Sequence, residues 1–283
     1  MQLDLQLKEQ PPLSYKKNSI AVPYSKRRLA SNKNSMRSIL FAAALVLACA
    51  SAWSALPDEI QVYTDDLEAP GEHGTELHIN TTPKGRSTPD YPGEVVPHHG
   101  LRITPELSFG LAPHWDAGVY LPFVRNAEGT EYFAGPRLRL KWIPVRPAEG
   151  NAGYFAGINW EFSFVERRFE QARRTAEFRP IVGYRNADWL LSFNPIIDTD
   201  LAGSQKGKLI FAPAFKAARS VSNHTAFGVE YYAELGRLSS FAPQSQQLHT
   251  LFLIVDTRRI NFGIGRGLNG ASDSWTVKGI ISF

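Results

Sequence analysis

Residues 154–164 read Tyr-Phe-Ala-Gly-Ile-Asn-Trp-Glu-Phe-Ser-Phe, and this stretch carries the pattern that governs most of the chain. Apolar side chains at even positions alternate with Asn159, Glu161 and Ser163. Because successive side chains of a strand point to opposite faces, the stretch predicts a strand with one apolar and one polar face. Its eleven residues exceed the length of a typical soluble strand and suit a tilted membrane strand of about 9–11 residues.

The same alternation recurs beyond Ala55, and no stretch shows helical periodicity. We count twelve such segments, at residues 74–82, 100–111, 116–126, 130–143, 152–165, 175–186, 188–198, 207–218, 224–236, 248–257, 259–268 and 273–283. An even number of strands lets both chain ends lie on the periplasmic side, as in bacterial outer-membrane barrels. We therefore expect an all-β fold over residues 74–283, an antiparallel transmembrane up-and-down β-barrel of about 12 strands.

The connections between these segments support a barrel, and the prolines argue against it. Short links follow segments two, six and ten, whereas long links follow segments one, five, seven and nine, which matches short periplasmic turns and longer extracellular loops. Six prolines fall inside the predicted strands, at Pro105, Pro122, Pro136, Pro180, Pro195 and Pro213. Because proline cannot donate to a strand ladder, shorter strands in a soluble periplasmic β-sandwich remain the alternative.

An apolar run at residues 39–50 predicts export. Basic residues precede the run and Ala50-Ser51-Ala52 follows it, the arrangement of a secretory signal peptide over residues 36–55. We interpret residues 1–35 as a non-native or disordered extension, with Met36 as the start, and residues 56–73 as an N-terminal periplasmic segment. These features predict Sec-type export to the bacterial outer membrane.

The charge and cysteine content of the exported chain exclude several functions. Residues 1–52 hold eight of the 31 Lys and Arg residues but two of the 27 acids. Removing them leaves 23 (31 less 8) basic and 25 (27 less 2) acidic residues, so the basic character belongs to the leader and nothing points to nucleic acid. The single cysteine, Cys49, lies in the leader, so we expect no disulfide or thiol chemistry.

The last residues resemble a sorting signal. Trp275, Val277, Ile281 and Phe283 share one parity of the final strand, and the chain stops at Phe283. A terminal aromatic residue on such a strand is similar to the C-terminal signal of outer-membrane β-barrel proteins. That resemblance implies recognition by the barrel-assembly machinery, and the expected surroundings are outer-membrane lipid and lipopolysaccharide.

A second resemblance concerns the middle of the chain. Residues 177–181 (Glu-Phe-Arg-Pro-Ile), 194–196 (Asn-Pro-Ile) and 211–216 (Phe-Ala-Pro-Ala-Phe-Lys) resemble the central repeats of outer-membrane transporters of the phenol-degradation (meta-pathway) family. The likeness extends over about residues 100–235. It implies a barrel that moves small organic molecules, and it carries no catalytic residues over to this chain.

Charged residues of the polar parity are the candidate site. We expect them to line the lumen and the solute path: Arg102, Glu106, Arg137, Arg139, Glu161, Glu177, Arg179, Arg185, Glu230 and Glu234. Residues of neighbouring strands, Arg137, Arg139, Glu161, Glu177 and Arg179, are expected to converge on one wall. These charges either pair and fill a narrow barrel or line a wet channel. Four arginines, Arg167, Arg168, Arg173 and Arg174, form a candidate extracellular basic loop that binds lipopolysaccharide phosphates or collects anionic solutes; the alternative is a solvated loop or one folded inwards to plug the lumen.

These observations predict an outer-membrane channel or facilitator for a small anionic or aromatic solute. The alternatives are a plugged structural barrel and an outer-membrane lipid-modifying enzyme. No histidine shows the His-x-Ser spacing of outer-membrane lipases, and adjacent His98 and His99 are weak grounds for a metal site. We therefore predict no catalytic residues, no metal and no cofactor.

Overall fold

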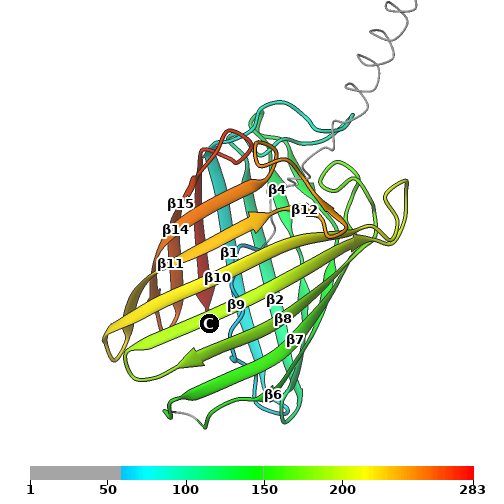
Figure 1. Ribbon diagram of the computed structural model, residues 1–283. Helices are drawn as coiled ribbons and strands as arrows, with labels where there is room; N and C mark the ends of the chain where they lie inside the picture. Colours follow the sequence, from blue (N-terminus) through cyan, green and yellow to red (C-terminus); the bar gives the residue numbers. More distant parts are fainter. Residues whose placement is uncertain (1–58, 149) are drawn as a thin grey trace, which may run out of the picture. The chain divides into compact units, whose positions relative to one another are not determined.

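The strands of this protein close into one antiparallel barrel. A computed structural model describes residues 59–148 and 150–283. The long strands are β1 (His73–Lys84), β2 (Leu101–Ala112), β3 (Trp115–Tyr120), β6 (Arg137–Val145), β7 (Gly153–Ser163), β8 (Thr175–Arg185), β9 (Trp189–Asp200), β10 (Leu209–Ser222), β11 (Thr225–Glu234), β14 (Leu248–Thr257), β15 (Ile260–Gly267) and β16 (Trp275–Ser282). Neighbours along the chain pair with one another, and β1 pairs with both β2 and β16, which closes the ring (Figure 1).

Two of the twelve strand positions are each built from two pieces. β4 (Phe123–Arg125) continues β3 along β2, and β5 (Glu131–Phe133) precedes β6. The breaks fall at Pro122 and Pro136, because proline has no N–H for the ladder. Counted this way, the predicted twelve-stranded antiparallel barrel is confirmed and the two-sheet sandwich is wrong. A small hairpin, β12 (Gly236–Arg237) with β13 (Ser240–Phe241), lies beside β10.

Of the remaining prolines, Pro105 lies opposite Leu77 of β1, and the other three lie at one level of β8, β9 and β10. Pro195 on β9 is the register partner of Pro213 on β10. Between β8 and β9 the pairing passes from Phe178↔Ile197 to Val182↔Phe193, and the positions between them, which include Pro180, do not pair. Pro180, Pro195 and Pro213 thus lie at the same level of three neighbouring strands. The missing N–H donors are confined to that level, and the ladder continues on either side of it.

The barrel has a loop end and a turn end. Connections at residues 85–100, 126–130, 164–174, 201–208, 235–247 and 268–274 form the loop end. Connections at residues 113–114, 146–152, 186–188, 223–224 and 258–259 form the turn end, together with the start of β1 and Phe283. The predicted alternation of long and short links holds except at 126–130 and 146–152, the two links that depart from it in the sequence.

The outward face of the barrel is apolar. Large side chains stand exposed on it, including Leu107 (40%), Phe162 (45%), Phe215 (38%) and Leu253 (68%). Near the turn end the indole rings of Trp115 and Trp142 stack with centroids 5.4 Å apart, and the rings of Tyr154 and Tyr184 lie 5.0 Å apart. An apolar band edged by aromatic rings suits a lipid bilayer. No helix in the described part of the chain is long and apolar enough to cross a membrane.

The N-terminal region departs from its predicted place. The signal peptide at 36–55 and the extension at 1–35 lie outside the described residues. Residues 56–73 were expected on the periplasmic side, but residues 59–66 lie within the barrel and contact β7, β9 and β16 before the chain turns into β1 (Figure 1). The expectation fails because the polar interior offers hydrogen-bond partners that a short flanking segment does not reveal.

Leu253 provides a test of the lipid-facing surface. Leu253→Arg places a charge near the middle of β14, so we expect it to lower the free energy of unfolding in lipid vesicles by about 2–4 kcal/mol. Val221→Arg, close to the turn end of β10, is the matched control and should cost about 0–1 kcal/mol. Equal losses measured by denaturant titration would contradict a membrane-embedded outer face.

Candidate functional site in the barrel lumen

The polar parity of the strands faces the interior, as the sequence pattern predicts. Arg102, Glu106, Glu161, Arg179 and Glu230 are almost fully buried although each side chain is ionisable. The structure places all ten predicted lumen residues on the inner face: Arg102, Glu106, Arg137, Arg139, Glu161, Glu177, Arg179, Arg185, Glu230 and Glu234. Their role in a solute path remains a prediction.

Residues 59–66, which we call the inner segment, are fastened to the lumen wall through their backbone. The Tyr63 N–H donates to Asn194 Oδ1 at 2.7 Å. The Tyr63 carbonyl accepts from Asn194 Nδ2 at 3.1 Å and from Ser192 Oγ at 2.5 Å. Asn194 is fully buried and bonds to both backbone groups of Tyr63. Its side-chain amide therefore provides the acceptor and the donor that the backbone of a paired strand would provide.

Two cations bind the N-terminal part of the inner segment. Arg179 Nη1 donates to the Gln61 carbonyl at 3.1 Å, and Lys278 Nζ donates to the Ile60 carbonyl at 2.9 Å. The Arg179 guanidinium also lies over the Tyr63 ring, 4.4 Å from its centroid. Charge-assisted bonds to carbonyls are stronger than neutral ones, so these contacts hold the segment across the bore.

Apolar side chains of the inner segment also pack against the lumen wall. Ile60 packs with Phe252 and Ile254, and Val62 packs with Ile196 and Ala214. Tyr63 packs with Ile143, Phe155 and Ile181, and its hydroxyl lies 2.6 Å from that of Tyr120. Ile60, Val62 and Tyr63 thus bury apolar groups against different walls of the lumen.

Ion pairs fill the turn-end half of the lumen beside the inner segment, whose Asp65 itself lies 3.2 Å from Arg185. Arg139 bonds to Glu106 at 2.7 Å and to Asp116, and Lys141 lies 3.6 Å from Asp116. Arg139, Glu161 and Glu177 share one wall, as predicted, because the register pairs them in turn across β6, β7 and β8. The two residues Arg139 and Glu161 are register partners, but the guanidinium turns to the acids on β2 and β3 because they form two charge-assisted bonds.

A second network lies across the bore. Glu230 pairs with Lys278 and with Lys216 at 3.4 Å, and Lys216 pairs with Asp256 at 2.7 Å. Sequence analysis did not single out Asp116, Lys216 or Lys278. Each lies at an inward position of an alternating strand, so the parity that identified Glu230 would also have identified them.

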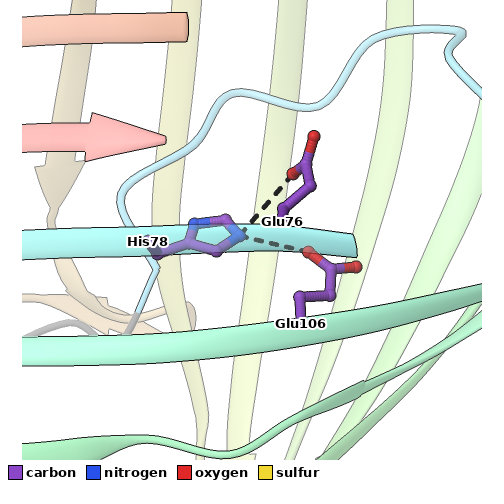
Figure 2. A group of neighbouring side chains, drawn as sticks. All are labelled: Glu76, His78 and Glu106. Atoms are coloured by element: carbon purple, nitrogen blue, oxygen red, sulfur yellow. Dashed lines mark hydrogen bonds and ion pairs between the residues drawn. The ribbon is translucent and has the colours of Figure 1, made fainter. Parts of the chain in front are cut away.

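Glu76, His78 and Glu106 form the one described trio of side chains close enough to share a metal ion, with ligand atoms within 4.8 Å of one another (Figure 2). His78 Nε2 lies 3.1 Å from Glu106 Oε2 and 3.7 Å from Glu76 Oε2. One imidazole and two carboxylates suit a divalent ion such as zinc. Glu106 is already bonded to Arg139 and Glu76 to Ser282, so the trio is equally complete as a buried ion-pair network.

A cavity of about 350 Å³ occupies the loop-end half of the barrel, beyond the inner segment. Five of the predicted lumen residues line it together with the inner segment: Arg137, Glu161, Glu177, Arg179 and Glu234. Asp198 of β9 also lines it and was missed by sequence analysis, although it lies on the same parity as Asn194 and Ile196. Burial raises the pKa of the Asp273 carboxyl, which borders the cavity from the 268–274 loop.

The 164–174 loop folds over the loop end. Phe169 is buried with Val124, Ala134 and Val165, and Glu170 pairs with Arg137 inside the barrel. Arg167, Arg168, Arg173 and Arg174 remain exposed on the loop. The loop therefore has an inward apolar and acidic side, which narrows the entrance, and an outward basic side.

Comparison with solved structures supports the fold. An outer membrane channel from Pseudomonas putida F1 is similar over 80% of this chain and 100% of that chain, with 11% identity and a TM-score of 0.52. The transport unit of the autotransporter AIDA-I from Escherichia coli matches over 86% of this chain and 96% of that chain, with 11% identity and a TM-score of 0.36. No protein-family model and no curated protein matches the chain. The first likeness shows that the chain has the fold of an outer-membrane barrel.

Asn194 provides a test of the inner segment. Asn194→Ala leaves the N–H of Tyr63 without its buried acceptor, which should cost about 1–3 kcal/mol locally. We expect faster amide hydrogen exchange in residues 59–66 than in the wild type, with the strands unchanged. Asn186→Ala, in an exposed turn, is the control. Unchanged exchange in the inner segment would show that Asn194 does not hold it.

Proposed function

We propose that this chain is a bacterial outer-membrane channel or facilitator for a small organic solute, gated by its own inner segment. The observation that carries the proposal is the cavity of about 350 Å³ between the loops and residues 59–61. That volume accommodates a small organic molecule within the usual range of ligand pockets. Its floor is an extended segment held by hydrogen bonds rather than a strand of the barrel wall, so the floor can move without opening the barrel.

The proposed location is the outer membrane, with the loop end outside the cell. The apolar outer face, the predicted signal peptide at 36–55 and the terminal Phe283 support it. In bacterial barrels the longer connections are extracellular, and here both ends of the barrel domain lie at the turn end. We propose Sec-type export followed by recognition of Phe283 by the barrel-assembly machinery.

The lining of the cavity bears on the class of solute. Aromatic and aliphatic side chains, among them Ile196, Ile210 and Phe252, share the wall with carboxylates. An aromatic or aliphatic body therefore fits the cavity, in line with the phenol-degradation resemblance. The acids make an anionic solute unfavourable. We therefore propose an aromatic solute rather than an anionic one.

A plugged structural barrel is the second candidate, favoured by the number of bonds that hold Tyr63 and Arg179. The two functions differ in whether the inner segment moves. A lipid-modifying activity has no comparable support among the described residues, so our expectation that the chain is not an enzyme remains a prediction.

The exposed arginines of the 164–174 loop suggest a lipid partner. We propose that they bind lipopolysaccharide phosphates, since the guanidinium fork matches phosphate geometry. Replacing Arg167, Arg173 and Arg174 with Gln should weaken binding of the protein to lipopolysaccharide, measured by flotation with lipopolysaccharide vesicles at low salt. Equal binding at low salt would refute the assignment, while the stability of the barrel should not change in either case.

Single-channel recording tests the gating function. In planar bilayers we expect the refolded exported chain to give small or infrequent current steps, and a variant lacking residues 56–66 to give steps several-fold larger. The Ser192→Ala and Asn194→Ala double variant, which keeps the full chain but loses the bonds to Tyr63, should open more often. Glu131→Gln, exposed on β5, is the control. Silence of all variants after verified insertion would favour the structural barrel.

A further inference from the structure

Three carboxylates form a direct row across three neighbouring strands of the cavity wall. Glu161 on β7 is the register partner of Glu177 on β8, and Glu177 is the partner of Asp198 on β9. All three side chains line the loop-end cavity. Like charges directly opposite one another on a sheet are destabilising, so this acid row costs the barrel stability unless a cation compensates it.

The protein itself neutralises this acid row only in part. Arg179 Nε and Nη2 bond to Glu177 at 2.5 and 3.0 Å. Glu161 accepts from two neutral donors, Asn159 Nδ2 at 2.8 Å and the Tyr63 hydroxyl at 3.1 Å. No described residue donates a hydrogen bond to Asp198 or forms an ion pair with it. The row therefore offers the cavity more carboxylates than its one bonded arginine pairs with.

The rest of the cavity wall extends this imbalance. Among the described lining residues, seven carry carboxylates and two carry guanidinium groups: Glu59, Glu161, Glu170, Glu177, Asp198, Glu234 and Asp273 against Arg137 and Arg179. Arg137 is paired with Glu170. Glu59 Oε1, on the inner segment, is buried without a hydrogen-bond partner, and it is an unsatisfied acceptor bordering the same space. Low-dielectric walls strengthen the field of such charges within a cleft.

The spacing of the acids argues against a bare metal ion. Among described residues, the trio close enough to coordinate one ion is Glu76, His78 and Glu106, and none of these lines the cavity. The carboxylates of the row are thus too dispersed to surround one small ion. An ammonium group needs only one or two carboxylate acceptors for its N–H donors, not a full coordination shell, and the apolar groups of Ile196, Ile210 and Phe252 offer a surface for an attached apolar body.

We propose that the loop-end cavity binds an organic cation, an ammonium group carried on an aromatic or aliphatic body. The ammonium lies at the acid row, with Asp198 as the acceptor to which no described residue donates. The apolar part lies against the side chains contributed by β9, β10 and β14. This inference rests on the proposed channel function and names the chemical class of its solute.

The proposal predicts opposite effects of one substitution on stability and on binding. Asp198→Asn removes a charge from the acid row while keeping the shape of the side chain. It should raise the resistance of the empty barrel to denaturant, because a like-charge repulsion is lost. It should also weaken binding of an ammonium compound about fivefold, the loss expected for a partly exposed charge pair. A residue that serves only the fold would not improve stability when neutralised.

The experiment compares three probes that share one aromatic body. Calorimetric titrations of the refolded exported chain in detergent at neutral pH would use phenethylammonium, 2-phenylethanol and phenylacetate. We expect the ammonium to bind most tightly and phenylacetate least, and the preference for the ammonium to shrink in Asp198→Asn. Glu131→Gln removes one carboxylate outside the cavity and should leave all three affinities unchanged.

The outcomes separate this inference from the channel function. Equal affinity for the three probes, or an unchanged preference in Asp198→Asn, would overturn the organic-cation site even if the barrel conducts. Displacement of phenethylammonium by low concentrations of calcium would also overturn it, in favour of an inorganic-cation site. Selective binding that depends on Asp198 in a barrel that never conducts would support the site and refute the channel.

Discussion

The closure of the sheet is the constraint on which the rest of the molecule depends. A bilayer offers no water to a strand edge, so backbone groups there must be paired within the protein. The pairing of β1 with both β2 and β16 removes the edge and makes an apolar outer face possible. The same closure creates an interior whose side chains are predominantly polar, because alternate residues of every strand must point inward.

That polar interior explains the position of the inner segment. Buried charges and amides need partners, and the ion pairs around Arg139 and Glu230 satisfy many of them. Asn194, Ser192 and Lys278 instead bond to the backbone of residues 60–63. An extended segment can provide carbonyls and N–H groups where a side chain cannot reach, so the wall and the segment satisfy each other.

The two halves of the lumen differ in their balance of acidic and basic side chains. Toward the turn end, cations and acids are matched, as in a packed interior that contributes to stability. Toward the loop end, acids exceed cations and a cavity of about 350 Å³ remains. The acid row of Glu161, Glu177 and Asp198 violates the usual pairing of charges across strands, and violations of this kind are expected at functional sites. Residues 59–61 of the inner segment form the boundary between the two regions.

Local periodicity determined the strands, the barrel and the facing of each charged residue, because the side-chain direction of a strand follows from position along the chain alone. Glu161 and Arg179 were therefore identifiable from the sequence, and Asp198 and Lys278 lay at positions of the same kind. Only the tertiary structure decided which charges meet. Arg139 turned away from its register partner to two acids on other strands, and residues 59–66 entered the lumen. Such choices depend on distances across the closed barrel, which no local pattern encodes.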